Sequence, residues 1–140
     1  MKYLLSWLIW NAKKILAAIA FLNFISPAVA APVPQTVTGT TGGGVDSKSC
    51  GFVAATPSYT LSIDRRIDYL RMLVEAQGGQ PTLLVVGPKN DDRFCILGDS
   101  SVGLDPEISG VWEPGSYSVY VGDREGAQHP FTLRILTDKN

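Results

Sequence analysis

The 140-residue sequence has little of what metal centres and nucleic-acid-binding surfaces are usually built from. It contains two cysteines and one histidine, and 12 Lys and Arg balance 13 Asp and Glu to leave a formal net charge of -1. Because no basic run occurs, we exclude a polybasic protein that binds nucleic acid. A composition of 45% hydrophobic and 18% charged residues also excludes a coiled coil, a collagen-like repeat and a charge-driven disordered chain. The length is that of one ordinary domain.

A long uninterrupted apolar run is also missing, but the N-terminus has a recognisable pattern. Residues 1–30 contain three lysines and no acidic residue, and the apolar stretch Ile15–Ile25 is followed by Ala28-Val29-Ala30. This order predicts a secretory signal peptide cleaved after residue 30, and therefore a periplasmic or secreted protein. The alternative is an uncleaved anchor, which would be the protein's only contact with a membrane. It is disfavoured because Lys13 and Lys14 would lie inside the spanning helix.

The segment after the signal peptide is poor in apolar residues. Residues 31–49 consist largely of Pro, Gly, Thr and Ser, with three valines and a run of three glycines. So little apolar surface offers little compensation for the entropy of ordering the backbone. The composition therefore predicts a flexible linker over residues 31–49, followed by the folded domain over residues 50–140.

The two cysteines lie at the start and near the middle of that domain. Exported proteins meet oxidising conditions, so we predict an intramolecular disulfide between Cys50 and Cys95. The alternatives are two buried free thiols or a bridge between two chains. A metal site built on cysteine is disfavoured, because the pair lacks close spacing and His129 is the only histidine.

Short alternating apolar runs separated by turn residues dominate the rest of the sequence. Alternation of this kind indicates half-buried strands, and the spacing is typical of an antiparallel sandwich or barrel. The strand candidates are Tyr59–Ile63, Thr82–Val86, Phe94–Leu97, Tyr117–Val121 and Phe131–Ile135. The segment Asp64–Ala76 is ambiguous, because its residues favour helix while its even positions also alternate as a strand face.

Several short motifs together resemble the bacterial pre-peptidase C-terminal domain over about residues 59–136. They are Tyr69–Val74, Thr82–Pro88, Cys95 with Asp99, Asp105–Ile108, Trp112–Gly122 and Phe131–Ile135. The resemblance implies an all-β, antiparallel jelly-roll-like β-sandwich of about seven to eight strands, with residues 64–76 largely strand. Such domains usually accompany a secreted enzyme, and no catalytic domain accompanies this one.

One loop is superficially similar to the surroundings of a serine nucleophile. Gly98–Gly103 contains Asp99 and Ser100, which would require a histidine to accept the hydroxyl proton. The only histidine, His129, follows the serine, in the reverse of the trypsin-like order. A small secreted hydrolase using the Asp99/Ser100 loop is therefore kept as the alternative to a non-enzymatic protein.

Four aspartates form the only candidate cofactor site, which would bind calcium. Asp91, Asp92, Asp99 and Asp105 flank the predicted strand Phe94–Leu97 in two turn-rich stretches. Calcium requires six to eight converging oxygen ligands, which these carboxylates and nearby carbonyls would supply. The simpler interpretation is that the acids are solvated turn residues.

Two aromatic residues are candidates for binding. Trp112 precedes a Pro-Gly turn, and Tyr120 alternates with the apolar face of its strand. Exposed rings at these positions would stack on a sugar or another protein, whereas the alternative places Trp112 in the core and packs Tyr120 against a neighbouring strand. We therefore expect an exported, non-enzymatic β-sandwich that acts as a binding or structural accessory module of the cell envelope. Its partner would be an envelope protein or a polysaccharide.

Overall fold

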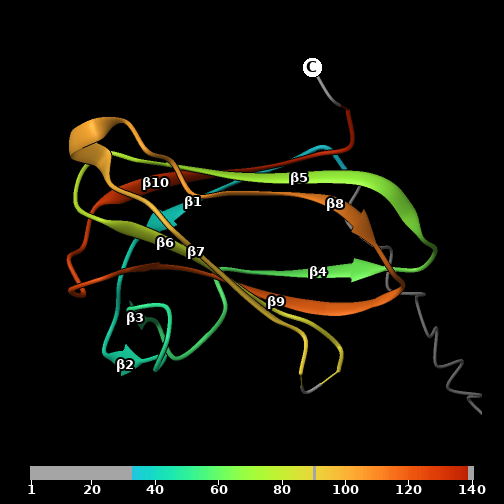
Figure 1. Ribbon diagram of the computed structural model, residues 1–140, viewed down its shortest axis with the longest axis horizontal. Helices are drawn as coiled ribbons and strands as arrows, with labels where there is room; N and C mark the ends of the chain where they lie inside the picture. The colour runs from blue at the N-terminus through green and yellow to red at the C-terminus, as the bar shows by residue number, and fades with distance from the viewer. Residues whose placement is uncertain (1–32, 90, 139–140) are drawn as a thin grey trace, which may run out of the picture.

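The computed structural model describes residues 33–89 and 91–138, and it confirms the all-β prediction (Figure 1). Apart from one 3-10 turn, η2 (Ser100–Val102), the regular elements of the described residues are strands. None of these residues forms a helix that is both long and apolar enough to span a membrane. The predicted signal peptide lies outside the described residues.

The strands form two antiparallel sheets that face each other as the layers of a sandwich (Figure 1). The four-stranded sheet has the order β1 (Gln35–Thr40), β10 (Pro130–Leu136), β5 (Ile67–Ala76) and β8 (Glu107–Trp112). The six-stranded sheet runs β2 (Val45–Asp46), β3 (Phe52–Val53), β9 (Gly115–Asp123), β6 (Pro81–Val86) and β7 (Arg93–Leu97), and β4 (Tyr59–Ile63) also pairs with β9.

The core lies between the sheets and is built from every second residue of the long strands. Alternation directs one face of each strand inward, so a period of two in the sequence becomes a continuous apolar layer. Burying each such side chain contributes about 1.5–3 kcal/mol. The fully buried members are Leu70, Met72, Val74, Leu83, Val85, Val119, Leu133 and Ile135.

Strand β5 resolves the ambiguity over residues 64–76 in favour of a strand. It is paired with β10 on one side and β8 on the other, with a bulge between Ile67 and Leu70. Within it Leu70, Met72 and Val74 are buried on the inner face. Pairing on both edges and burial of one face outweigh the modest helix preference of individual residues.

The prediction of a flexible linker over residues 31–49 is wrong for the part that the structure describes. Strand β1 pairs along its whole length with β10, and β2 pairs with β3. Val33 and Val37 pack against the core, and Thr41 is buried. Pairing with an existing sheet stabilises the backbone with few apolar side chains, so the domain begins before Cys50.

The predicted disulfide between Cys50 and Cys95 is present, with 5.6 Å between the two Cα atoms. Cys95 lies on β7, and Cys50 immediately precedes the short strand β3. Cys50 packs with Val53 and Leu84 in a small apolar cluster separate from the main core. The bond therefore fastens the β2–β3 arm to the outer face of the six-stranded sheet.

Candidate functional site

Strands β7 and β8 are the last strands of their respective sheets, and both line one cleft at the same side of the sandwich. Among the described residues β7 pairs only with β6, and β8 pairs only with β5. The connection between them, residues 98–106, contains η2 (Figure 1). Two sheet edges thus lie open beside each other.

Between the two edges lies a cleft of about 520 Å³. Phe94 from β7 and Ile108 and Val111 from β8 supply apolar lining, and Lys89 and Asp92 from the β6–β7 turn supply charged lining. Its lining also includes Gly110, where a Cβ atom would meet no other atom within 4 Å. A glycine here leaves space between two inward-facing positions of β8.

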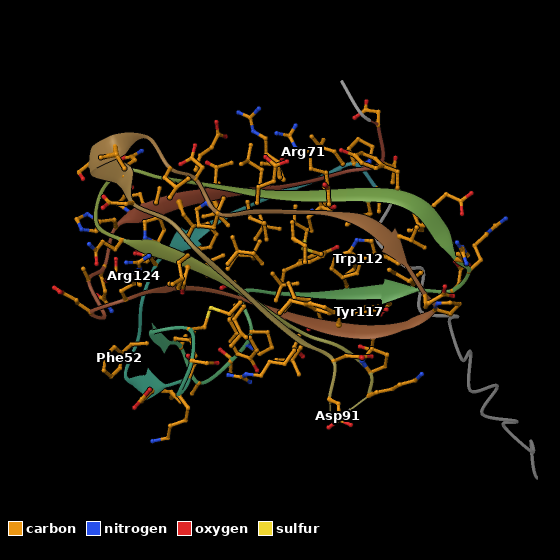
Figure 2. The ribbon with its side chains drawn as sticks, viewed as in Figure 1. Phe52, Arg71, Asp91, Trp112, Tyr117 and Arg124 are labelled. Atoms are coloured by element: carbon orange, nitrogen blue, oxygen red, sulfur yellow. A yellow bond between two sulfur atoms is a disulfide. The ribbon has the colours of Figure 1, made fainter. Side chains whose placement is uncertain are left out.

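Trp112 and Tyr117 also line this cleft, and both lie between the sheets (Figure 2). Their rings meet edge to face, with centroids 5.0 Å apart and planes inclined by 71°. The Tyr117 hydroxyl donates a 2.8 Å hydrogen bond to the backbone oxygen of Glu113, and burial raises the pKa of this hydroxyl. Trp112 is only 5% exposed and belongs to the core, so it offers little of its ring to the cleft.

Tyr120 lies on the other face of the six-stranded sheet. It packs against the cluster of Cys50, Val53 and Leu84, and it lines a separate groove of about 390 Å³ together with Arg93. The structure therefore does not bring Trp112 and Tyr120 together into one aromatic surface.

Exposed apolar side chains concentrate around the open edges. Of the seven large hydrophobic residues exposed in the described chain, five lie within residues 94–111, with exposed fractions between 43% and 74%. They are Phe94, Leu97, Val102, Leu104 and Val111. Sequence reasoning missed this surface, because alternation identifies an apolar strand face but does not reveal which strands lie at an edge.

The Asp99/Ser100 loop is occupied by structural hydrogen bonds. The Ser100 hydroxyl donates to the backbone oxygens of Gly78 at 3.2 Å and Ala76 at 3.4 Å. Asp99 accepts hydrogen bonds from the hydroxyl and the backbone N–H of Ser101, and these bonds lower the pKa of its carboxyl group. These contacts fasten the 3-10 turn to the loop that joins β5 to β6.

The structure does not bring together the four aspartates of the predicted calcium site. Asp91 and Asp92 precede β7, whereas Asp99 and Asp105 follow it, so the two pairs are separated by a five-residue strand of about 17 Å. Figure 2 shows Asp91 at the turn end of that strand. Within the described chain no three His, Cys, Asp or Glu residues are grouped so that they could hold a metal ion.

A buried carboxylate that sequence reasoning treated as part of a turn has a clear structural role. Asp123 is 1% exposed and accepts hydrogen bonds from three backbone N–H groups, those of Gln80, Glu125 and Ala127, at 2.8–3.1 Å. It therefore joins the end of β9 to the start of β6. The turn-like Gly-Asp pair was the only signal in the sequence, and it did not reveal the burial.

Comparisons with known proteins agree with this architecture. No family model matches the sequence. The structure is similar to that of the pre-peptidase C-terminal domain of a collagenase from Bacillus anthracis, with a TM-score of 0.53 and 17% identity, over 73% of this chain and 88% of that one. This likeness confirms the fold that the sequence motifs implied.

In sequence, the chain is 41% identical over 103 residues to an uncharacterized protein of Synechococcus elongatus. The match covers 71% of this chain and 72% of its relative. The chain therefore belongs to the family of that Synechococcus elongatus protein, and its fold is the β-sandwich of pre-peptidase C-terminal domains.

Proposed function

We propose that this protein is an exported, non-catalytic accessory module of the cell envelope that binds a partner protein at the β7–β8 side of the sandwich. The observation that carries the proposal is the cleft between the two open edges, which is lined by the exposed side chains of Phe94 and Val111. Exposed apolar side chains that gather in one region of a soluble protein are typical of an interaction site.

Four further features support export and a non-catalytic accessory role. The Cys50–Cys95 disulfide fits an oxidising compartment, and residues 1–30 have the layout of a signal peptide. The pre-peptidase C-terminal domain is an accessory fold rather than a catalytic one. The hydroxyl of Ser100 donates to backbone carbonyls, which gives the alternative hydrolase no activated nucleophile.

The lining of the cleft favours a protein over a polysaccharide. Sugar rings stack on exposed aromatic faces, and Trp112, which the sequence offered for such stacking, is only 5% exposed. Phe94 and Val111, which are about half exposed, offer apolar contact suited to aliphatic or aromatic side chains. Lys89 and Asp92 add charged groups to the lining, and protein–protein interfaces combine apolar and charged residues in this way.

Site-specific photo-crosslinking in living cells tests this proposal. A photoreactive phenylalanine derivative replaces Phe94 in the cleft, and the matched control replaces the exposed Thr38 on the opposite edge strand β1. We expect a discrete protein adduct at position 94 that is absent at position 38 and that weakens when Val111→Lys is added. Equal labelling at both positions, or none at position 94, would overturn the proposal, and a polysaccharide adduct would overturn the choice of partner.

Two simple measurements examine the remaining parts. The intact mass of protein from the cell envelope should correspond to a chain beginning at Ala31, whereas retention of residues 1–14 would contradict cleavage. In assays with chromogenic ester and peptide substrates, the wild-type protein and Ser100→Ala should give the same background rate. A loss of turnover in Ser100→Ala would instead support the hydrolase.

A further inference from the structure

We propose that the partner binds as an extended segment that adds a strand to the free edge of β7. This inference rests on the proposed function, and it names the kind of partner and its mode of binding. The first support is the register of β6 and β7. Hydrogen bonds flank their paired residues at both ends, from the N–H of Gly87 to the oxygen of Asp92 and from the N–H of Gly98 to the oxygen of Pro81.

The register determines which backbone groups of β7 are free. In an antiparallel pair, alternate residues direct both backbone groups towards the partner strand. Phe94 and Ile96 lie two and four residues after Asp92, so their backbone N–H and C=O groups point towards β6. The N–H and C=O groups of Arg93, Cys95 and Leu97 therefore point away from β6, where no other strand of the described chain pairs with them.

This edge lacks the devices that usually block strand addition. Proteins protect an edge with proline, bulges or outward-pointing lysines. Strand β7 contains no proline, glycine or lysine, and its one charged side chain, Arg93, donates a 2.7 Å hydrogen bond to the backbone oxygen of Ser47. The neighbouring edge is different, because β8 contains Gly110 and opposes the bulge in β5.

The side chains around the edge select an apolar segment. A strand added to β7 places every second side chain on the inner face of the sheet, beside Phe94 and over the cleft. The intervening side chains fall on the outer face, which carries the 43%-exposed Leu97. The cleft of about 520 Å³ has room for a large aliphatic or aromatic side chain.

The size and charge of the edge favour a short segment of another protein over a second copy of this chain. The five residues of β7 span about 17 Å. Pairing along so short an edge is a smaller contact than the interface of a stable dimer, which buries about 800 Å² on each partner. Asp91 and Asp92, at the turn end of β7, form no ion pair with any described residue. A basic residue at the corresponding end of the incoming segment would complement them.

Amide hydrogen exchange measured by NMR tests the inference on protein purified after expression of the full sequence. The probe is the capped peptide Lys-Val-Thr-Leu-Thr-Val-Lys, which alternates apolar residues between basic ends. We expect saturating peptide to slow exchange at Arg93, Cys95 and Leu97 by about tenfold or more, since each gains a backbone hydrogen bond. The amides of Phe94 and Ile96, already bonded to β6, are the internal controls.

Backbone and surface variants separate strand addition from other modes of binding. N-methylation of the peptide amides along one edge should abolish the protection while leaving every side chain in place. Val111→Lys at the cleft should weaken binding, and Thr38→Lys on β1 should not.

Three outcomes would overturn the inference. They are no protection of the three amides, protection that survives N-methylation on either edge, and protection that rises with protein concentration without peptide, which indicates a second copy. A photo-adduct at position 94 without amide protection would leave the proposed function intact and remove only strand addition. Absence of that adduct would remove the function itself.

Discussion

Reduction of the Cys50–Cys95 disulfide should cost this domain a large part of its stability. The bond closes a loop with a sequence separation of 45, which contains β3, β4, β5 and β6. In the chain-entropy model a loop of this length restricts the unfolded chain by about 4 kcal/mol at 25 °C. A domain of this size is typically stable by only about 5–15 kcal/mol in total, so the loss is substantial.

The folded state should survive reduction at room temperature, because other contacts hold the same region. Thr82 donates a 2.8 Å hydrogen bond to the backbone oxygen of Cys50, and the N–H of Cys50 donates a 2.9 Å bond to the Ser47 hydroxyl. The hydrogen bond from Arg93 to Ser47 also joins the arm to β7. We therefore expect similar NMR spectra for the oxidised and reduced proteins, with the difference arising in the unfolded state.

Urea unfolding of the oxidised and reduced wild-type protein, followed by tryptophan fluorescence, measures this effect without creating a cavity. We expect a loss of about 2–4 kcal/mol in the free energy of unfolding, accompanied by a melting temperature lower by about 10 °C or more. The double variant Cys50→Ala/Cys95→Ala is the control, because reductant should not change its midpoint. A loss below about 1 kcal/mol on reduction would refute the loop-closure reasoning.

Three further predictions concern charged groups. Asp123→Ala should lower the free energy of unfolding in urea by about 3–5 kcal/mol, because it leaves three backbone N–H groups without their acceptor. Asp123→Asn keeps one acceptor oxygen and should cost less, and equal costs for the two variants would contradict this role. Hydrogen bonds from Arg71 lower the pKa of Glu107 from 4.5, so their stabilisation is present above that value and is lost as pH falls through the lower folded-state pKa. Arg71 of this ion pair lies on the outer face of the sandwich (Figure 2). Glu107→Gln should therefore destabilise by about 0.5–1 kcal/mol at neutral pH and have no effect in strong acid. An effect that does not depend on pH would argue against the ion pair. Calcium binding stays a prediction, and thermal unfolding in millimolar calcium or in chelator tests it. A higher midpoint in calcium would support binding, and equal midpoints, which the separation of the four aspartates favours, would contradict it.

Features that depend on local sequence were predictable. Alternating apolar residues identified most of the strands, because an alternation with a period of two can be recognised in a stretch of about five or more residues. The disulfide was predictable because the sequence predicts export and its two cysteines allow one intramolecular pairing. Among the candidate site residues, the position of Trp112 in the core was one of the two alternatives that its pattern allowed.

Features that depend on the partner of a segment were not predictable from the segment itself. Residues 35–40 are nearly all polar, and they become strand β1 only because β10 offers a complementary edge. Residues 67–76 have the composition of a helix and the alternation of a strand. They form strand β5 because they pair with β10 on one side and with β8 on the other.

The same distinction separates the expected sites from the observed one. Proximity in sequence suggested that Asp91, Asp92, Asp99 and Asp105 would converge, but a strand is a rigid spacer that holds its two ends apart. By itself the sequence determined the β class, the strand faces and the disulfide, since these follow from local periodicity and residue chemistry. Only the tertiary structure decided which strands lie at an edge, and therefore where apolar side chains and free backbone groups lie together. The physical reason is that an edge strand is one that pairs on a single side, which depends on the arrangement of the other strands.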